Sequence, residues 1–169
     1  FEQYLNKCKE TLNTQFEQYR ISEALMTVYT GFRDEFSSWL LEIIKPGFEQ
    51  PIDRTTYNKT IYLFEEMLQL LHPFMPFITE EIWQNLRERK DGESIMVSVM
   101  PIPGKYDENF LNTFENMKEV IAGIRTIRKQ NNIAFKDTIS LRVKSNDRYP
   151  LQFENIIRKM GNIQDVEMV

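Results

Sequence analysis

The sequence contains few of the residues from which catalytic and metal sites are usually built. Its 169 residues include one cysteine, Cys8, and one histidine, His72. An internal disulfide or a zinc site built from several cysteines is therefore impossible, and a Ser-His-Asp or Cys-His set would have to use His72. The 6 glycines are scattered at turns and form no phosphate-binding loop. We expect no catalytic residue, no metal site and no cofactor site in this chain.

Long hydrophobic runs and an excess of basic charge are also missing. No apolar segment approaches the ~20 residues that span a bilayer, and no secretory signal is present, so we expect no membrane partner. A single cysteine fits a reducing, cytoplasmic location. The net charge of −4 is unusual for a dedicated nucleic-acid-binding module, although large RNA-binding enzymes can be acidic with local basic faces. Hydrophobic content of 41% with 27% charged residues indicates a helix-rich globule with a real core.

Apolar residues recur every three to four positions over most of the chain, which predicts amphipathic helices. Asp53 is a suitable N-cap, and Asp107 or Asn109 should start the fifth helix. Lys45-Pro46-Gly47 should end the second helix. We expect the apolar faces to share one core. The acidic pairs Glu65-Glu66 and Glu80-Glu81 are interpreted as solvated or helix-starting charges. The expected helices cover residues 1–19, 22–45, 53–71, 79–89 and 107–131.

The last part of the chain changes character. Residues 139–144 alternate apolar and polar with period two, which predicts a strand. A turn at Asn146-Asp147, a helix over 151–160 and a second strand over 163–169 should follow. The expected fold is mainly α, with a helical domain over residues 1–132. A partial α+β domain, truncated at the C-terminus, is expected over 133–169.

The most informative segment is the corner Leu70–Trp83. Pro73 and Pro76 interrupt a run of helix formers, so one helix must end and another begin. We expect the apolar residues of this elbow to be buried and His72 to pack there, bonding a neighbouring carbonyl. The segment closely resembles the elbow in the anticodon-binding helical domain of valyl-tRNA synthetases, which are class I aminoacyl-tRNA synthetases.

Two further runs carry candidate RNA-binding cations. In residues 124–133, Arg128 falls on the apolar stripe and is flanked by Arg125 and Lys129. These cations could bind phosphates, or they could compensate the helix dipole where the stripe ends; Arg128 could also be held by a buried acid. In residues 29–46, Arg33 and Lys45 accompany spaced aromatics that could stack on nucleotides, although aromatics at this spacing are more often core.

Both runs also resemble valyl-tRNA synthetases, in the same order as in that family. Met100 and Leu40 stand where the family often has Trp and Tyr. The resemblance implies a domain that binds the tRNA anticodon stem-loop, within a monomeric enzyme that joins valine to tRNA using ATP and magnesium. The resemblance also implies that the catalytic and editing domains lie outside this chain. The alternatives are the same domain of a leucyl- or isoleucyl-tRNA synthetase, or a helical protein-interaction module without RNA contact.

Overall fold

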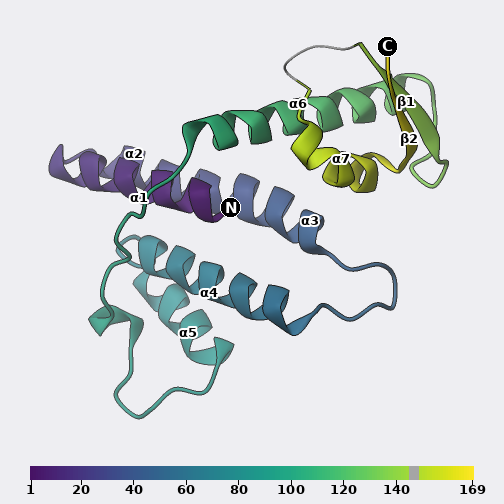
Figure 1. Ribbon diagram of the computed structural model, residues 1–169. Coiled ribbons are helices and arrows are strands. Elements are labelled where there is room, and N and C mark those ends of the chain that lie inside the picture. Colours follow the sequence, from purple (N-terminus) through teal and green to yellow (C-terminus); the bar gives the residue numbers. More distant parts are fainter. Residues whose placement is uncertain (145–148) are drawn as a thin grey trace. The chain divides into compact units, whose positions relative to one another are not determined.

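The computed structural model describes residues 1–144 and 149–169, and the chain divides into two compact units. The first unit, Phe1–Tyr106, is helical, and the second, Asp107–Val169, combines helices with a small sheet (Figure 1). The mainly α class with a small α+β part is thereby confirmed. Helix α6 (Glu108–Gln130) belongs to the second unit, although the sequence analysis assigns it to the helical domain. The expected domain boundary at residue 132 stays a prediction.

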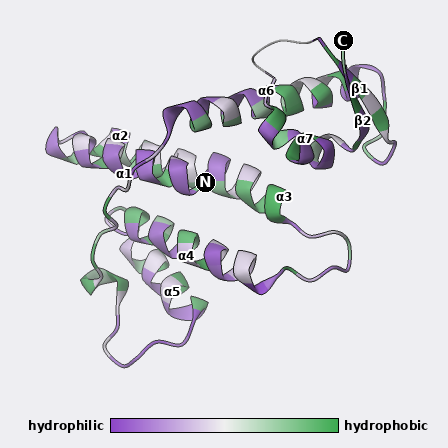
Figure 2. Ribbon diagram, viewed as in Figure 1, coloured by the Kyte–Doolittle hydropathy of each residue, from purple (hydrophilic) through white to green (hydrophobic). Residues whose placement is uncertain are grey.

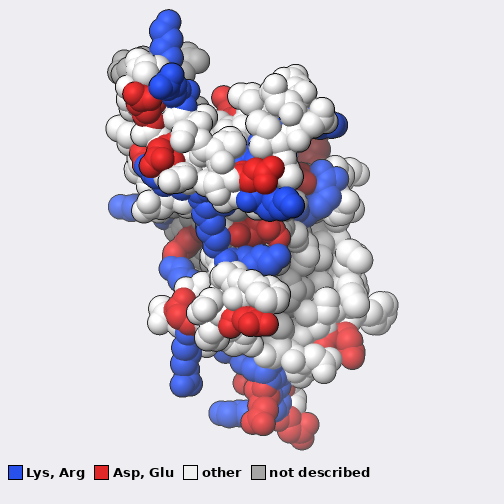
Figure 3. All heavy atoms as spheres, turned by 90° about the vertical axis from the view of Figure 1, so that its right-hand side faces the viewer, with Lys and Arg blue, Asp and Glu red and all other residues white. Residues whose placement is uncertain are grey.

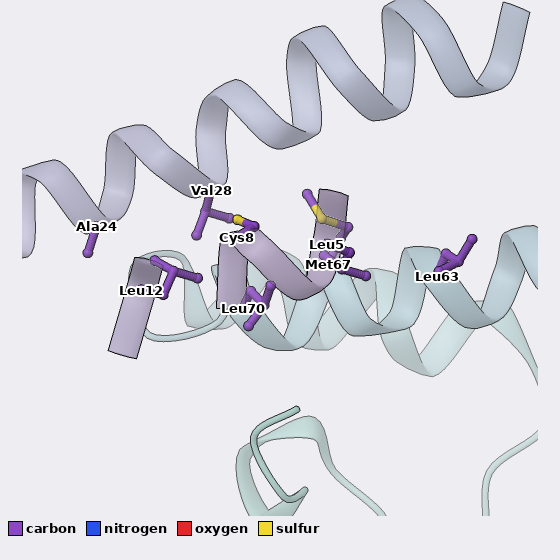
Figure 4. Packing of buried hydrophobic residues seen from close by; sticks show 8 residues of the cluster. All are labelled: Leu5, Cys8, Leu12, Ala24, Val28, Leu63, Met67 and Leu70. Carbon is purple, nitrogen blue, oxygen red and sulfur yellow. The ribbon is translucent and has the colours of Figure 1, made fainter. Parts of the chain in front are cut away.

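The main core of the first unit lies between three helices, α1 (Glu2–Glu17), α2 (Ile21–Thr30) and α4 (Arg54–Leu71). Figure 2 shows hydrophilic and hydrophobic residues alternating along these helices, as expected for helices with one buried face. The buried residues point toward one another from the three helices in Figure 4. The cluster comprises Leu5, Cys8, Leu12, Ala24, Val28, Leu63, Met67 and Leu70.

A long π-helix interrupts the second helical run. Helix α2 continues directly into the π-helix η1 (Gly31–Leu40) and the short helix α3 (Leu41–Ile44), and the run ends before Lys45, as expected. The hydroxyl groups of Ser37 and Ser38 each donate a 2.9 Å hydrogen bond to the carbonyl five residues earlier. These bonds follow the i→i+5 spacing of a π-helix and support this uncommon conformation.

A second, smaller cluster contains Leu68, Trp83 and Ile95. Leu68 belongs to α4, Trp83 to α5 (Pro76–Leu86), and Ile95 to the 3₁₀ turn η2 (Ile95–Val97). The expectation of one common core was therefore wrong: the first unit has two clusters, and Phe114 and Ile121 lie in the second unit.

The proline elbow joins α4 to α5 as predicted, with Pro76 at the start of α5. Its apolar residues are less buried than expected. Phe77 is 90% exposed and Met75 is 49% exposed, while Phe74 is half-buried and stacks on Phe16. Periodicity indicated a hydrophobic corner, but a tight turn points successive side chains in different directions. Only part of the corner can therefore face the core.

In the second unit, two parallel strands pair, and α7 (Glu154–Gly161) packs against both α6 and the second strand. Strand β1 (Ile139–Val143) pairs with β2 (Ile163–Met168), and the register shifts between Ile139 and Ser140. A short 3₁₀ turn, η3 (Leu151–Phe153), precedes α7. The strand–helix–strand order matches the expectation, whereas the turn expected at Asn146-Asp147 lies outside the described residues.

Candidate nucleic-acid interface

The exposed cation Arg33 lies at the junction of α2 and the π-helix. Its Nε donates a 2.7 Å hydrogen bond to Oδ1 of Asp34, and a terminal nitrogen donates a 2.8 Å bond to Oδ2. The guanidinium carbon also lies 5.2 Å from the centre of the Tyr29 ring. Hydrogen bonding to Asp34 raises the pKa of Arg33, so the side chain is charged at any physiological pH. This arginine is exposed but held by two neighbours.

A glycine lies where the Tyr4 side chain of α1 contacts the start of the π-helix. A Cβ atom built on Gly31 would lie 3.3 Å from two atoms of the Tyr4 side chain, closer than most side-chain contacts. Gly31 itself is buried. A larger residue here would require the end of the Tyr4 side chain to move by a few tenths of an ångström.

Lys45 follows α3 at the end of the same helical run. Its ammonium group lies 4.0 Å from a carboxylate oxygen of Glu42, and its side chain is 69% exposed. A loose ion pair at such exposure contributes little to stability.

The aromatics between these two cations mostly belong to the core, as the more frequent interpretation of their spacing predicts. Phe36 is buried, and its ring contacts Phe1, Phe32 and Phe64 at centroid distances of 5.4 to 5.9 Å. Trp39 is half-buried. Tyr29, at 46% exposure, is the residue of this run that combines an accessible ring with a bound cation.

The three cations of α6 have different environments. Arg125 and Lys129 are exposed, but the Arg128 side chain is buried at 4% exposure. Its guanidinium donates to the carbonyls of Gly161 and Asn162, just before β2, with bonds of 2.9 to 3.1 Å. It also donates 2.9 Å bonds to the carbonyls of Ala134 and Asp137, in the loop before β1.

Arg128 therefore ties the end of α6 to the segments that lead into both strands of the sheet. A direct contact with a phosphate would require these bonds to open, which is costly for a buried guanidinium. The buried acid considered as an alternative partner is not what holds it either: backbone carbonyls satisfy the charge. Sequence spacing correctly put Arg128 on the buried face, but it could not identify carbonyls contributed by a loop and a distant turn.

Two acidic residues that the sequence analysis interpreted as solvated are in fact partners of basic side chains. Glu65 is buried and accepts hydrogen bonds from Arg87 and Arg89, with the Nε of Arg87 at 2.8 Å. Arg89 also lies over the Trp83 ring, 3.4 Å from its centre. Glu66 pairs with the buried Lys9 at 3.0 Å. The periodicity of α4 did indicate that Glu65 is buried, because Glu65 lies one turn before the buried residue Leu68.

His72 has a structural role at the elbow. Its Nδ1 lies 2.7 Å from the hydroxyl oxygen of the fully buried Thr79, which donates a 2.8 Å bond to the carbonyl of Met75. The His72 tautomer decides which partner donates in the bond between Nδ1 and the Thr79 hydroxyl. The expected packing is confirmed, but the partner is a hydroxyl rather than a carbonyl.

Charge is mixed on one face of the molecule. Lys and Arg side chains are interspersed with Asp and Glu on the face drawn in Figure 3. Within residues 1–144 and 149–169, no group of three or more histidine, cysteine or acidic side chains is arranged to hold a metal ion. No helix in the same residues is both long enough and apolar enough to cross a membrane.

Comparison with known proteins defines the class of domain. Residues 1–144 match the family model of the anticodon-binding domain of tRNA ligase, and the chain belongs to that family. Its helices are thus those of an anticodon-binding domain of the kind found in tRNA ligases.

Individual relatives are more specific. Over the whole chain, it is 51% identical to a valine–tRNA ligase of Phocaeicola vulgatus and 47% identical to one of Parabacteroides distasonis. A valine–tRNA ligase of Thermotoga maritima is 30% identical over 98% of the chain. The chain spans 19% of the length of each of these relatives.

Proposed function

We propose that this chain is the anticodon-binding part of a valine–tRNA ligase and binds the anticodon stem-loop of the tRNA for valine. The observation that carries the proposal is the 47–51% identity to valine–tRNA ligases along the entire chain. The whole enzyme would attach valine to its tRNA with ATP and magnesium, as a monomer in the cytoplasm. In this proposal the ATP and magnesium sites belong to other parts of the enzyme.

The task of such a domain is to hold one end of the tRNA on a rigid platform while the other end reaches the catalytic site. The three-helix core supplies the platform, because its buried side chains are close-packed and define one arrangement. Phosphate contacts then position the RNA, and contacts to unpaired bases provide specificity. We assign the phosphate contacts to Lys45, Arg125 and Lys129, which are exposed on the ends of two helical runs.

The test is a salt-dependent binding titration of the 169-residue chain with labelled anticodon stem-loops. We expect tighter binding to the valine stem-loop than to those for leucine and isoleucine. Preference for either of those would favour a leucyl- or isoleucyl-tRNA synthetase. Absence of binding to all three at low salt would favour a protein-interaction module and overturn the proposal.

Single substitutions test the phosphate contacts. Lys45→Gln or Lys129→Gln should weaken binding to all stem-loops alike and reduce the slope of log K against log salt by about 0.7–0.9 for each phosphate no longer neutralised. Arg20→Gln is the matched control, because Arg20 is an exposed cation at the start of α2 that pairs with Glu23 and is not among the proposed contacts. An equal loss of slope in the control would show that only overall charge matters.

A further inference from the structure

Arg33 differs from Lys45 in how closely its charge is paired with a carboxylate. Asp34 takes two of its five N–H donors in a bidentate pair, and the two opposite charges leave the pair neutral overall. A phosphate approaching this guanidinium would also approach the Asp34 carboxylate, and like charges repel. The electrostatic gain from a phosphate is therefore much smaller here than at Lys45, whose ion pair with Glu42 spans 4.0 Å.

The geometry instead favours stacking of a planar ligand on the flat face of the Arg33 guanidinium. A guanidinium is planar and weakly hydrated, and it stacks on aromatic rings and nucleobases in a way that an ammonium group does not. Asp34 fixes the plane of this guanidinium, and the Tyr29 ring lies next to it at 5.2 Å. The side chain of Arg33 is nevertheless 60% exposed, and Tyr29 is 46% exposed. Much of this surface is accessible although the side chains are held.

The segment that carries the pair is also held. Tyr29 is in the last turn of α2 and Arg33 in the first turn of the π-helix, one helical turn apart on adjoining elements. The carbonyl of Arg33 accepts a hydrogen bond from the hydroxyl of Ser38. Gly31, which lies between Tyr29 and Arg33 in the chain, contacts the Tyr4 side chain of α1. Little conformational entropy remains to be lost when a planar ligand stacks here.

We propose that Tyr29 and Arg33, with Asp34 as the positioning residue, form a stacking platform for one unpaired nucleobase of the RNA loop. This inference rests on the proposed function and gives Arg33 a role other than phosphate neutralisation. Stacking of a base on such a surface is tolerant of sequence, so the platform contributes affinity and orientation more than base identity.

Base stacking and a phosphate contact predict different results for conservative variants. Arg33→Lys keeps the charge but loses the planar fork, so stacking predicts binding weaker by about five- to a hundredfold with an unchanged salt slope. A phosphate contact predicts near-normal binding for Arg33→Lys. Asp34→Asn separates the roles independently: it removes a negative charge and would strengthen a phosphate contact, whereas it releases the guanidinium plane and should weaken stacking.

The experiment uses anticodon stem-loops with 2-aminopurine at each loop position in turn. One position should show fluorescence quenching on binding that is lost in Arg33→Lys and in Tyr29→Leu, while Tyr29→Phe, which keeps the ring, retains it. Circular dichroism melts check that each exposed-site variant remains folded. Stem-loop binding by Arg33→Lys equal to that of the unsubstituted chain would overturn the platform alone. Absence of binding by the unsubstituted chain would overturn the proposed function and the platform together.

Discussion

Replacing Arg128 by methionine should destabilise the second compact unit selectively. Methionine is long and apolar, so it fills part of the space but donates no hydrogen bond. The substitution removes five hydrogen bonds to four backbone carbonyls. The Gly161 carbonyl is bonded in a buried environment, while the remaining three are closer to solvent and can bind water instead.

The magnitude follows from this difference. A buried acceptor left without a partner costs about 1–3 kcal/mol, and a hydrogen bond to a charged group contributes about 1.5–3 kcal/mol, less where water can replace the lost donor. Because such terms are not additive, we expect a loss of about 3–5 kcal/mol in the free energy of unfolding of this unit. Native domains have only about 5–15 kcal/mol in total, so the effect should be large.

The two units can be followed separately. Both tryptophans, Trp39 and Trp83, lie in the first unit, so their fluorescence reports urea unfolding of that unit alone. Hydrogen exchange of the strand segments 139–143 and 163–168, measured by mass spectrometry, reports the second unit. We expect much faster exchange there in Arg128→Met, with little change in the tryptophan transition.

Lys129→Met is the matched control, because it removes a neighbouring cation that is exposed. Its stability should stay within about 0.5 kcal/mol of that of the unsubstituted chain. Exchange in the strands that is no faster in Arg128→Met than in this control would refute the structural role of Arg128.

Three further predictions concern the first unit. Met67→Ala should cost about 2–5 kcal/mol in a urea melt, because Met67 is fully buried between three helices. Phe77→Ser should change stability by no more than about 0.5 kcal/mol, since that side chain is 90% exposed; a larger loss would show that the elbow is more buried than described. Desolvation acts to raise the pKa of Glu80, but hydrogen bonds from Gln84, Ser94 and two backbone N–H groups outweigh it and lower the pKa below 4.5. The stability from Glu80 is therefore fully present above pH 4.5 and lost as the pH falls through the lowered pKa. Glu80→Gln should accordingly lower the free energy of unfolding more at about pH 7 than at about pH 3. An equal loss at both pH values would contradict a lowered pKa for Glu80.

Local features of the fold could be predicted well from the sequence. Asp53 and Asp107 cap α4 and α6 through bonds to backbone N–H groups, and the strand–helix–strand order follows from the change of period after residue 138. These features depend on neighbouring residues, so the sequence pattern contains them. The match to the anticodon-binding family model extends over the same helical segments whose motifs suggested it.

Features that depend on distant partners could not be predicted. The pairing of Glu65 with Arg87 and Arg89 joins residues 22 and 24 positions apart, and nothing in the periodicity of α4 identifies those partners. The same holds for Arg128, whose carbonyl partners include Gly161 and Asn162. The π-helix was missed for a different reason, since its apolar spacing resembles that of an ordinary helix over so short a segment.

The π-helix has a consequence for how this chain can tolerate changes in length. Each residue of a π-helix turns the chain less than a residue of an α-helix does, because each hydrogen bond closes over one more residue. The run from Ile21 to Ile44 therefore holds a surplus of residues relative to ideal α geometry. Deletion of a residue within 31–40 could be absorbed by a return to α-helical bonding, whereas in α4 it would rotate the buried face out of the core. Changes in the length of this helical run should therefore be tolerated better within residues 31–40 than a deletion in α4 would be.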